Sequence, residues 1–119
     1  MSGKRSDITN LTPGEDVGLV WTITDENGNP VTNMTGWAVA FYLLRSLEPG
    51  SDDASLAAAA LLVKRTGGQG ITLAAPEVRV SLAAADTQSL PPGLYWYELW
   101  RTDSGNRRRL AYGGMVFLP

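Results

Sequence analysis

The sequence predicts an all-β domain built from two packed antiparallel sheets. Apolar residues recur at every second position in several short segments, which is the period of a strand with one buried face. Runs of Gly, Pro, Asn and Asp that favour turns separate these segments. A length of 119 residues, with 44% hydrophobic and 18% charged residues, is typical of one globular domain. We therefore expect a sandwich of about seven strands with one short helical crossing.

The first half of the chain predicts three strands. A brief strand over 8–11 ends at a Thr-Pro-Gly turn, and residues 17–24 alternate between apolar and small or polar side chains. Residues 25–30 contain Asn-Gly followed by a proline, which indicates a turn because Asn-Gly accepts positive φ and proline lacks an N–H for pairing. The third strand is expected over 37–44.

The second half predicts further strands around two segments of helical composition. Residues 48–53 favour a loop, and Ser55 begins an alanine-rich run that favours a helical turn. The remaining expected elements are a strand over about 61–66, short strands over 71–73 and 78–82, a helical crossing over 83–90, the strand 93–101 and a final strand over about 108–118.

The strand 93–101 is aromatic on both of its faces. Tyr95, Tyr97 and Leu99 share one face, and Trp96 and Trp100 share the other. Glu98 lies between the two tryptophans, and a lone carboxylate is rarely buried, so we expect its face to point outward. The expected core then contains Trp21, Ile23, Trp37, Val39, Phe41, Val80, Leu82, Tyr95, Tyr97 and Leu99.

The outward tryptophans are the candidate partner interface. If the strand 37–44 pairs beside 93–101, Tyr42 and Leu44 join Trp96 and Trp100 in a flat apolar patch. Three uses fit such a patch: a protein interface, a platform for sugars, or a platform for nucleobases. The alternative is that another segment, around residues 46–60, folds over the tryptophans and makes them part of the core.

Three consecutive arginines, Arg107, Arg108 and Arg109, follow the last predicted turn. Arginine forks match carboxylates and phosphates, so this run is a candidate contact for an acidic partner. A solvated hairpin end is the interpretation we favour, because charge runs usually face solvent.

The composition argues against most chemistry. The chain has no histidine and no cysteine, which removes the commonest general base, metal ligands and thiolate nucleophile. We expect no catalytic residues, no cofactor and no metal. The net charge of −2 does not favour nucleic acid, and no apolar run has the length of a membrane span. The polar N-terminus does not resemble a signal peptide, so we expect the protein to be cytoplasmic when made.

The chain is expected to divide into an N-terminal arm, residues 1–7, and a single domain, residues 8–119. The arm is short, basic and glycine-containing, so alone in water it should be disordered. In an assembly it would lie along a neighbour.

Several motifs resemble those of a known family. They are Asp7-Ile8-Thr9, Asp25-Glu26-Asn27-Gly28-Asn29-Pro30, Thr35-Gly36-Trp37, Gly70-Ile71-Thr72-Leu73, Leu82-Ala83-Ala84-Ala85-Asp86-Thr87 and Leu90-Pro91-Pro92-Gly93-Leu94-Tyr95-Trp96-Tyr97-Glu98-Leu99. Their order resembles the small immunoglobulin-like domains of tailed phages, whose best-known members are the N-terminal domains of baseplate upper proteins.

The resemblance implies an immunoglobulin-like β-sandwich that is a structural component of the virion. Such a domain docks onto other phage structural proteins in the tail, baseplate or fibre attachment, in multiple copies within a symmetric assembly, and is not an enzyme. Two alternatives stay open: a capsid decoration (cement) protein, and a carbohydrate-binding module for a host receptor.

Overall fold

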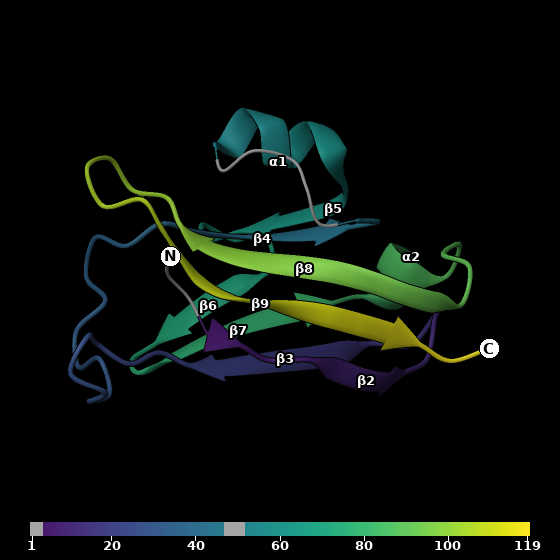
Figure 1. The fold of residues 1–119 in the computed structure, drawn as a ribbon, viewed down its shortest axis with the longest axis horizontal. Coiled ribbons are helices and arrows are strands. Elements are labelled where there is room, and N and C mark those ends of the chain that lie inside the picture. Colours follow the sequence, from purple (N-terminus) through teal and green to yellow (C-terminus); the bar gives the residue numbers. More distant parts are fainter. Residues whose placement is uncertain (1–3, 47–51) are drawn as a thin grey trace.

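The fold is known from a computed structural model that describes residues 4–46 and 52–119. Within these ranges the chain forms nine strands and two short helices (Figure 1). In chain order they are β1 (Lys4–Arg5), β2 (Ile8–Leu11), β3 (Val17–Thr22), β4 (Val39–Leu44), α1 (Asp53–Ala59), β5 (Ala60–Arg65), β6 (Ile71–Ala74), β7 (Glu77–Leu82), α2 (Ala84–Thr87), β8 (Gly93–Arg101) and β9 (Arg108–Phe117).

The strands form two facing sheets. The larger sheet has the order β1-β9-β8-β4-β5, with β2 also paired to β9, and the smaller has the order β3-β7-β6. β1 and β2 run parallel to β9, and the other neighbouring strands pair antiparallel. The smaller sheet, β3-β7-β6, corresponds to strands B, E and D of an immunoglobulin-like sandwich, and β4, β8 and β9 of the larger sheet correspond to strands C, F and G. The predicted sandwich is confirmed.

Local alternation predicted the strands well. The structure has strands at each position where the sequence predicted one, and the predicted crossing over 83–90 contains α2. The predicted loop over 48–53 lies mostly outside the described residues. The expected core residues are buried between the sheets, except that Trp37 is only partly buried. The described residues form nine strands where about seven were expected: the eight segments predicted as strands all form one, and the N-terminal segment adds β1.

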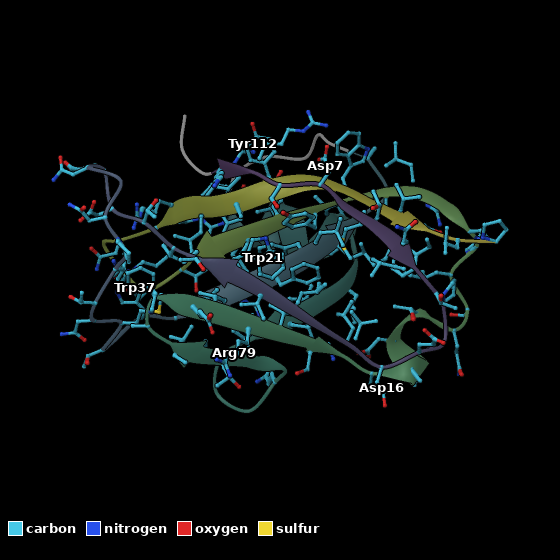
Figure 2. All side chains as sticks on the ribbon, turned by 90° about the horizontal axis from the view of Figure 1, so that it is seen from below. Asp7, Asp16, Trp21, Trp37, Arg79 and Tyr112 are labelled. Atoms are coloured by element: carbon cyan, nitrogen blue, oxygen red, sulfur yellow. The ribbon has the colours of Figure 1, made fainter. Side chains whose placement is uncertain are left out.

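An aromatic cluster joins the two sheets where many immunoglobulin domains have a disulfide. Trp21 of β3 lies with its ring centroid 5.3 Å from that of Tyr97 on β8 and 5.9 Å from that of Phe41 on β4. The Trp21 Nε1–H donates to the Tyr97 hydroxyl over 3.1 Å. Figure 2 shows Trp21 between the two layers. A buried hydrogen bond thus links the two sheets in a chain that has no cysteine.

The crossing into β8 is fixed by polar contacts on α2 and on Tyr95. The Tyr95 hydroxyl donates to the Pro91 carbonyl over 2.6 Å, which is the tyrosine corner of immunoglobulin-like sandwiches. At α2, the amide of Ala84 donates to Asp16 over 2.7 Å, and the Lys64 ammonium pairs with Asp86 at 2.8 Å. These contacts set where β8 begins, and so which of its residues face the core.

The N-terminal arm differs from the expectation. Lys4–Arg5 forms β1 along β9 of the same chain, and the Ser6 amide donates to the Tyr112 carbonyl over 2.8 Å. The Gly114 amide donates to the Asp7 carboxylate over 2.9 Å. A Cβ on Gly113 would lie 2.4 Å from the Ser6 carbonyl oxygen, so the close approach needs glycine there. The expected disorder of the arm is therefore wrong for residues 4–7, and residues 1–3 lie outside the described ranges.

The Trp21–Tyr97 contact makes a testable contribution to stability. Tyr97→Phe keeps the ring but leaves the buried Trp21 N–H without its acceptor, so we expect a loss of about 1–3 kcal/mol in the free energy of unfolding. Denaturant unfolding of Tyr97→Phe, Trp21→Phe and the double variant measures it. The double variant should lose less than the sum of the singles, and additive losses would show that the hydrogen bond contributes nothing.

Candidate docking surface

The outer face of the larger sheet is half covered by α1 (Figure 1). Tyr42 and Leu44 point to this face, and their exposed fractions are 0% and 1% because Leu56 of α1 packs on them. The expected open patch is therefore wrong for Tyr42 and Leu44. The alternative, a segment near residues 46–60 folded over the sheet, describes this half of the face. Trp96 and Trp100 pack at the margin of the same cluster and are partly buried.

Two carboxylates of consecutive residues position α1 on the sheet. Asp52 caps the helix by accepting the Ser55 amide over 3.1 Å. Asp53 accepts a hydrogen bond from the Tyr42 hydroxyl and pairs with Arg65 of β5 at 3.0 Å. Burial, and then the hydrogen bond to Asp53, raise the pKa of Tyr42 to about 12. A helix of seven residues is marginal alone, so these contacts and Leu56 hold it in place.

The half of the outer face left open by α1 carries alternating arginines and aromatic rings. The Arg107 guanidinium lies 4.5 Å from the centre of the Trp100 ring, and that of Arg109 lies 4.0 Å from the centre of the Tyr112 ring. A third pair comes from the N-terminal strand, with Arg5 5.6 Å from the centre of the Trp96 ring. We call these six residues the arginine–aromatic row: Arg5, Trp96, Trp100, Arg107, Arg109 and Tyr112.

The register of β8 and β9 assembles this row. Trp100 lies opposite Arg109, Glu98 opposite Tyr112, and Trp96 opposite Gly114. A Cβ on Gly114 would lie in ordinary contact with the Trp96 ring, at 3.7 Å, and closer to the Leu94 side chain, at 3.2 Å. β1 pairs with the edge of β9 that faces away from β8, and Arg5 lies opposite Tyr112. Arg5 therefore reaches the row from the β1 side of β9.

Glu98 lies on the outer face as expected, but it is buried, with an exposed fraction of 7%. Its carboxylate accepts a hydrogen bond from the Trp100 Nε1–H over 2.7 Å and lies 3.8 Å from the Arg109 guanidinium. A buried carboxylate is tolerated when it is paired in this way. The expectation that Glu98 marks a solvated face is therefore wrong. The Glu98 carboxylate orients the Trp100 side chain by accepting its Nε1–H.

The three consecutive arginines separate in the structure. Arg107 and Arg109 join the row, whereas Arg108 points toward Trp37, with its guanidinium 5.9 Å from the ring centre. All three are partly buried, so a fully solvated hairpin end does not describe them. Stacking on rings explains this partial burial, because a guanidinium can lie flat over an aromatic face.

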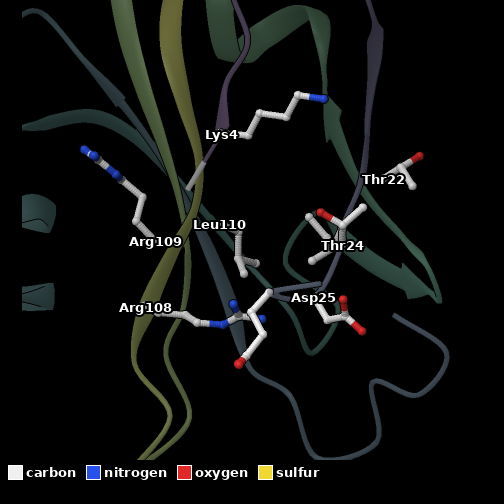
Figure 3. A pocket seen from close by; sticks show the side chains of 9 residues that line it. Lys4, Thr22, Thr24, Asp25, Arg108, Arg109 and Leu110 are labelled. Carbon is white, nitrogen blue, oxygen red and sulfur yellow. The ribbon is translucent and has the colours of Figure 1, made fainter. Parts of the chain in front are cut away.

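Arg108 lines a pocket of about 260 Å³ at the open side of the sandwich (Figure 3). Lys4 lines the opposite side of this pocket, and Asp25 and Glu26 add two carboxylates to its lining. In residues 4–46 and 52–119 no group of three or more acidic residues could hold a metal ion. The described residues also include no helix long and apolar enough to cross a membrane.

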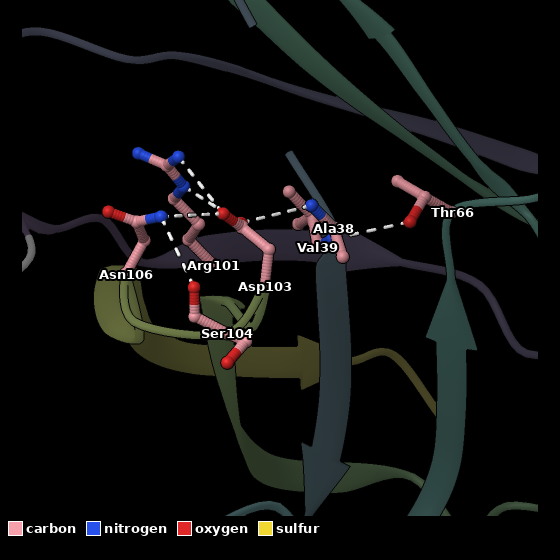
Figure 4. Close-up of polar contacts among 7 residues, drawn as sticks. All are labelled: Ala38, Val39, Thr66, Arg101, Asp103, Ser104 and Asn106. Atoms are coloured by element: carbon pink, nitrogen blue, oxygen red, sulfur yellow. Dashed lines mark hydrogen bonds and ion pairs between the residues drawn. The ribbon is translucent and has the colours of Figure 1, made fainter. Parts of the chain in front are cut away.

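The hairpin that joins β8 to β9 is rigid because of Asp103 (Figure 4). Its carboxylate accepts hydrogen bonds from Arg101 over 2.8 and 3.0 Å, from the Ala38 amide over 3.1 Å and from Asn106 over 3.0 Å. The Arg101 guanidinium in turn lies 4.2 Å from the centre of the Trp37 ring. The hydrogen bonds from Arg101, and then that from Ala38, hold the pKa of Asp103 far below its usual range.

The packing of α1 predicts a specific effect of truncating its buried residue. Leu56→Ala should destabilise the protein by about 2–5 kcal/mol and uncover Tyr42 and Leu44, because Leu56 is the completely buried side chain of α1. Denaturant unfolding and the fluorescence of a hydrophobic dye measure the two effects. Leu61→Ala, at a side chain 42% exposed on β5, is the control and should change little. Equal losses would show that α1 does not cover the sheet.

The lowered pKa of Asp103 predicts that the stability of the protein depends on pH. Its lowered pKa means that the folded state favours the carboxylate, so the stabilisation is present above the unfolded pKa of about 4 and is lost as pH falls below it. Asp103→Asn should therefore be less stable than the parent at pH 7, with a difference that shrinks toward pH 2. The control is Glu15→Gln, at an exposed carboxylate. A difference independent of pH would contradict the assignment.

Comparisons with known proteins add no family to this description. No family model matches the chain, and the search of curated proteins finds no match either.

Proposed function

We propose that this protein is a non-enzymatic structural component of a tailed-phage particle, which docks onto other virion proteins through the arginine–aromatic row. The observation that carries the proposal is the composition and packing of that row. It gathers two Trp, one Tyr and three Arg on one face of a paired sheet, with each arginine against a ring. Trp, Tyr and Arg are the residues that most often dominate the binding energy of protein interfaces.

The row is already organised for binding. Trp100 is oriented by Glu98, and Arg107 and Arg109 rest on rings 4.5 and 4.0 Å from their centres. Side chains held in this way lose little conformational entropy when a partner docks, which favours affinity. Three guanidinium groups give this face positive charge, which suits acidic groups on a protein surface. We expect a partner surface that is apolar at its centre with acidic residues around it.

The row fits a protein partner better than a sugar. A sugar platform needs an open ring face, and the Arg107 guanidinium lies over the face of Trp100. The assignment to a phage particle draws on the resemblance to tailed-phage immunoglobulin-like domains. A capsid decoration protein would use the same docking chemistry, so the position in the particle, whether tail, baseplate or capsid, is read from the experiment below.

The test uses purified particles of the phage that encodes the chain. Arg5→Glu and Trp96→Ser each remove one member of the row, and both variants should be incorporated at least about tenfold less than the parent, which corresponds to about 1.4 kcal/mol of binding. Mass spectrometry of the particles measures incorporation, and electron microscopy of a tagged protein gives its position. Thermal unfolding checks that each variant is folded.

Arg79→Glu on β7 is the matched control. Arg5 and Arg79 each pair with a carboxylate two residues away, and their side chains are 54% and 56% exposed. Arg79 lies on the smaller sheet, away from the row (Figure 2). The Arg79→Glu variant should be incorporated into particles as well as the parent. Absence of the parent from the particles, or normal incorporation of both row variants, would overturn the proposal. Normal incorporation with loss of attachment to host cells would identify a receptor-binding role instead.

A further inference from the structure

β3 has an unpaired edge without the features that usually protect such edges. It ends the order β3-β7-β6, and no strand in residues 4–46 and 52–119 pairs with its outer side. Its six residues, Val17–Thr22, contain no charge and no proline, and they pair with β7 in unbroken register. An exposed strand edge of this kind is a template for another strand.

The other edges of the two sheets are protected. β5 carries Lys64 and Arg65, both in ion pairs. β6 and β2 are four residues long, and β2 is broken by a register shift near Asn10, which has a positive φ of 63°. β1 has only two residues, both basic. Short length, charge and irregular register are the ordinary means of preventing edge pairing. β3 alone among these edges lacks all of them.

The backbone groups that face the open side of β3 can be assigned from its register. The amide of Ile23 donates to the carbonyl of Pro76, so the odd residues of β3 exchange hydrogen bonds with β7. Because hydrogen-bonding direction alternates along an antiparallel strand, Gly18, Val20 and Thr22 direct their N–H and C=O groups outward. Val20 is 55% exposed. The edge therefore offers three donors and three acceptors in a row.

The unequal widths of the sheets leave room beside β3. The larger sheet is five strands wide along its main path and the smaller is three. At a spacing of about 4.8 Å per strand, the larger sheet is about 10 Å wider. Two pockets, of about 260 and 170 Å³, lie between β3 and the strands β1 and β9. The smaller pocket is lined by Trp21, Ile23, Leu110 and Ala111, which would contact the inward side chains of an added strand.

The pockets favour a single strand over a second copy of the domain. A second copy paired through its own β3 would bring its wider larger sheet into the space that β1 and β9 already occupy. An extended segment has no such sheet and fits beneath β1. Glu15 and Asp16 are exposed at the start of β3 and form no ion pair with any described residue. A strand antiparallel to β3 places its C-terminal end beside these two carboxylates.

We propose that β3 binds an extended segment of a partner protein as an added antiparallel strand. The segment has about six residues with no charge in the middle, apolar side chains at alternate positions facing Trp21 and Leu110, and a basic residue at its C-terminal end. Main-chain hydrogen bonds supply the affinity, and the pockets select the alternate side chains. This surface is separate from the arginine–aromatic row.

The test uses the blocked peptide Thr-Val-Thr-Val-Thr-Val-Lys-Lys and the ¹⁵N-labelled protein. In the proposed register the threonines lie opposite Gly18, Val20 and Thr22, so their N–H groups face β3 and those of the valines face away. A peptide N-methylated at the valines should bind and shift the amide signals of these three residues. A peptide N-methylated at the threonines should not bind.

Val20→Pro is the matching change in the protein. Proline removes an N–H that faces the open edge and leaves the hydrogen bonds to β7 intact, so the fold should persist. We expect it to weaken binding of the valine-methylated peptide about tenfold, through one lost hydrogen bond and one unpaired carbonyl. Val20→Thr keeps the N–H and should bind like the parent. Glu15→Lys should weaken this peptide and favour one ending in Glu-Glu.

Several outcomes would overturn the proposal. The valine-methylated peptide could fail to bind at millimolar concentration, or both methylated peptides could bind equally well. The peptide could also shift the amide signals of the arginine–aromatic row in place of those of β3. Concentration-dependent self-association that shifts the same three amides would identify a second copy as the occupant. Trp96→Ser should bind the peptide normally, so the result is independent of the proposal for the row.

Discussion

The burial of both faces of β8 is the constraint on which the rest of the structure depends. Tyr95, Tyr97 and Leu99 fill the space between the sheets, and Tyr97 meets Trp21 there through a ring contact and a hydrogen bond. On the other face, Glu98 is buried and paired. A strand held on both faces cannot shift by one residue, because the shift would exchange the two sets of side chains. The site therefore rests on a rigid support.

The fixed register of β8 organises the docking surface around it. β9 places Arg109 and Tyr112 beside Trp100 and Glu98, and its Gly113 lets the N-terminal segment approach and bring Arg5 to the row. On the other side, β4 directs Tyr42 and Leu44 under α1. One half of the outer face is thus a second small core, and the other half carries the arginine–aromatic row. The division follows from the place where α1 packs.

The sequence predicted the sandwich and its core because these depend on local alternation and turn residues. It left a cover formed by residues 46–60 only as an alternative, because the packing of α1 depends on Leu56 meeting strands distant in the chain. One signal was present: residues 39–44 are apolar at every position, which is typical of a strand buried on both faces. The pairing of the arm with β9 had no local signal, since it depends on glycines more than a hundred residues away. The burial of Glu98 likewise depends on Trp100 and Arg109 together.

Oxidative footprinting of the aromatic residues, in the free chain and in assembled particles, tests whether the protein docks through the arginine–aromatic row. In the free chain, Trp96, Trp100 and Tyr112 should be oxidised faster than Trp21 and Tyr97, which lie between the sheets. In particles, Trp96, Trp100 and Tyr112 should become protected from oxidation. The oxidation rates of Trp21 and Tyr97 should stay low. Equal oxidation of the row in the two states would contradict docking through this face. Fast oxidation of Trp21 in the free chain would contradict the packing from which the account begins.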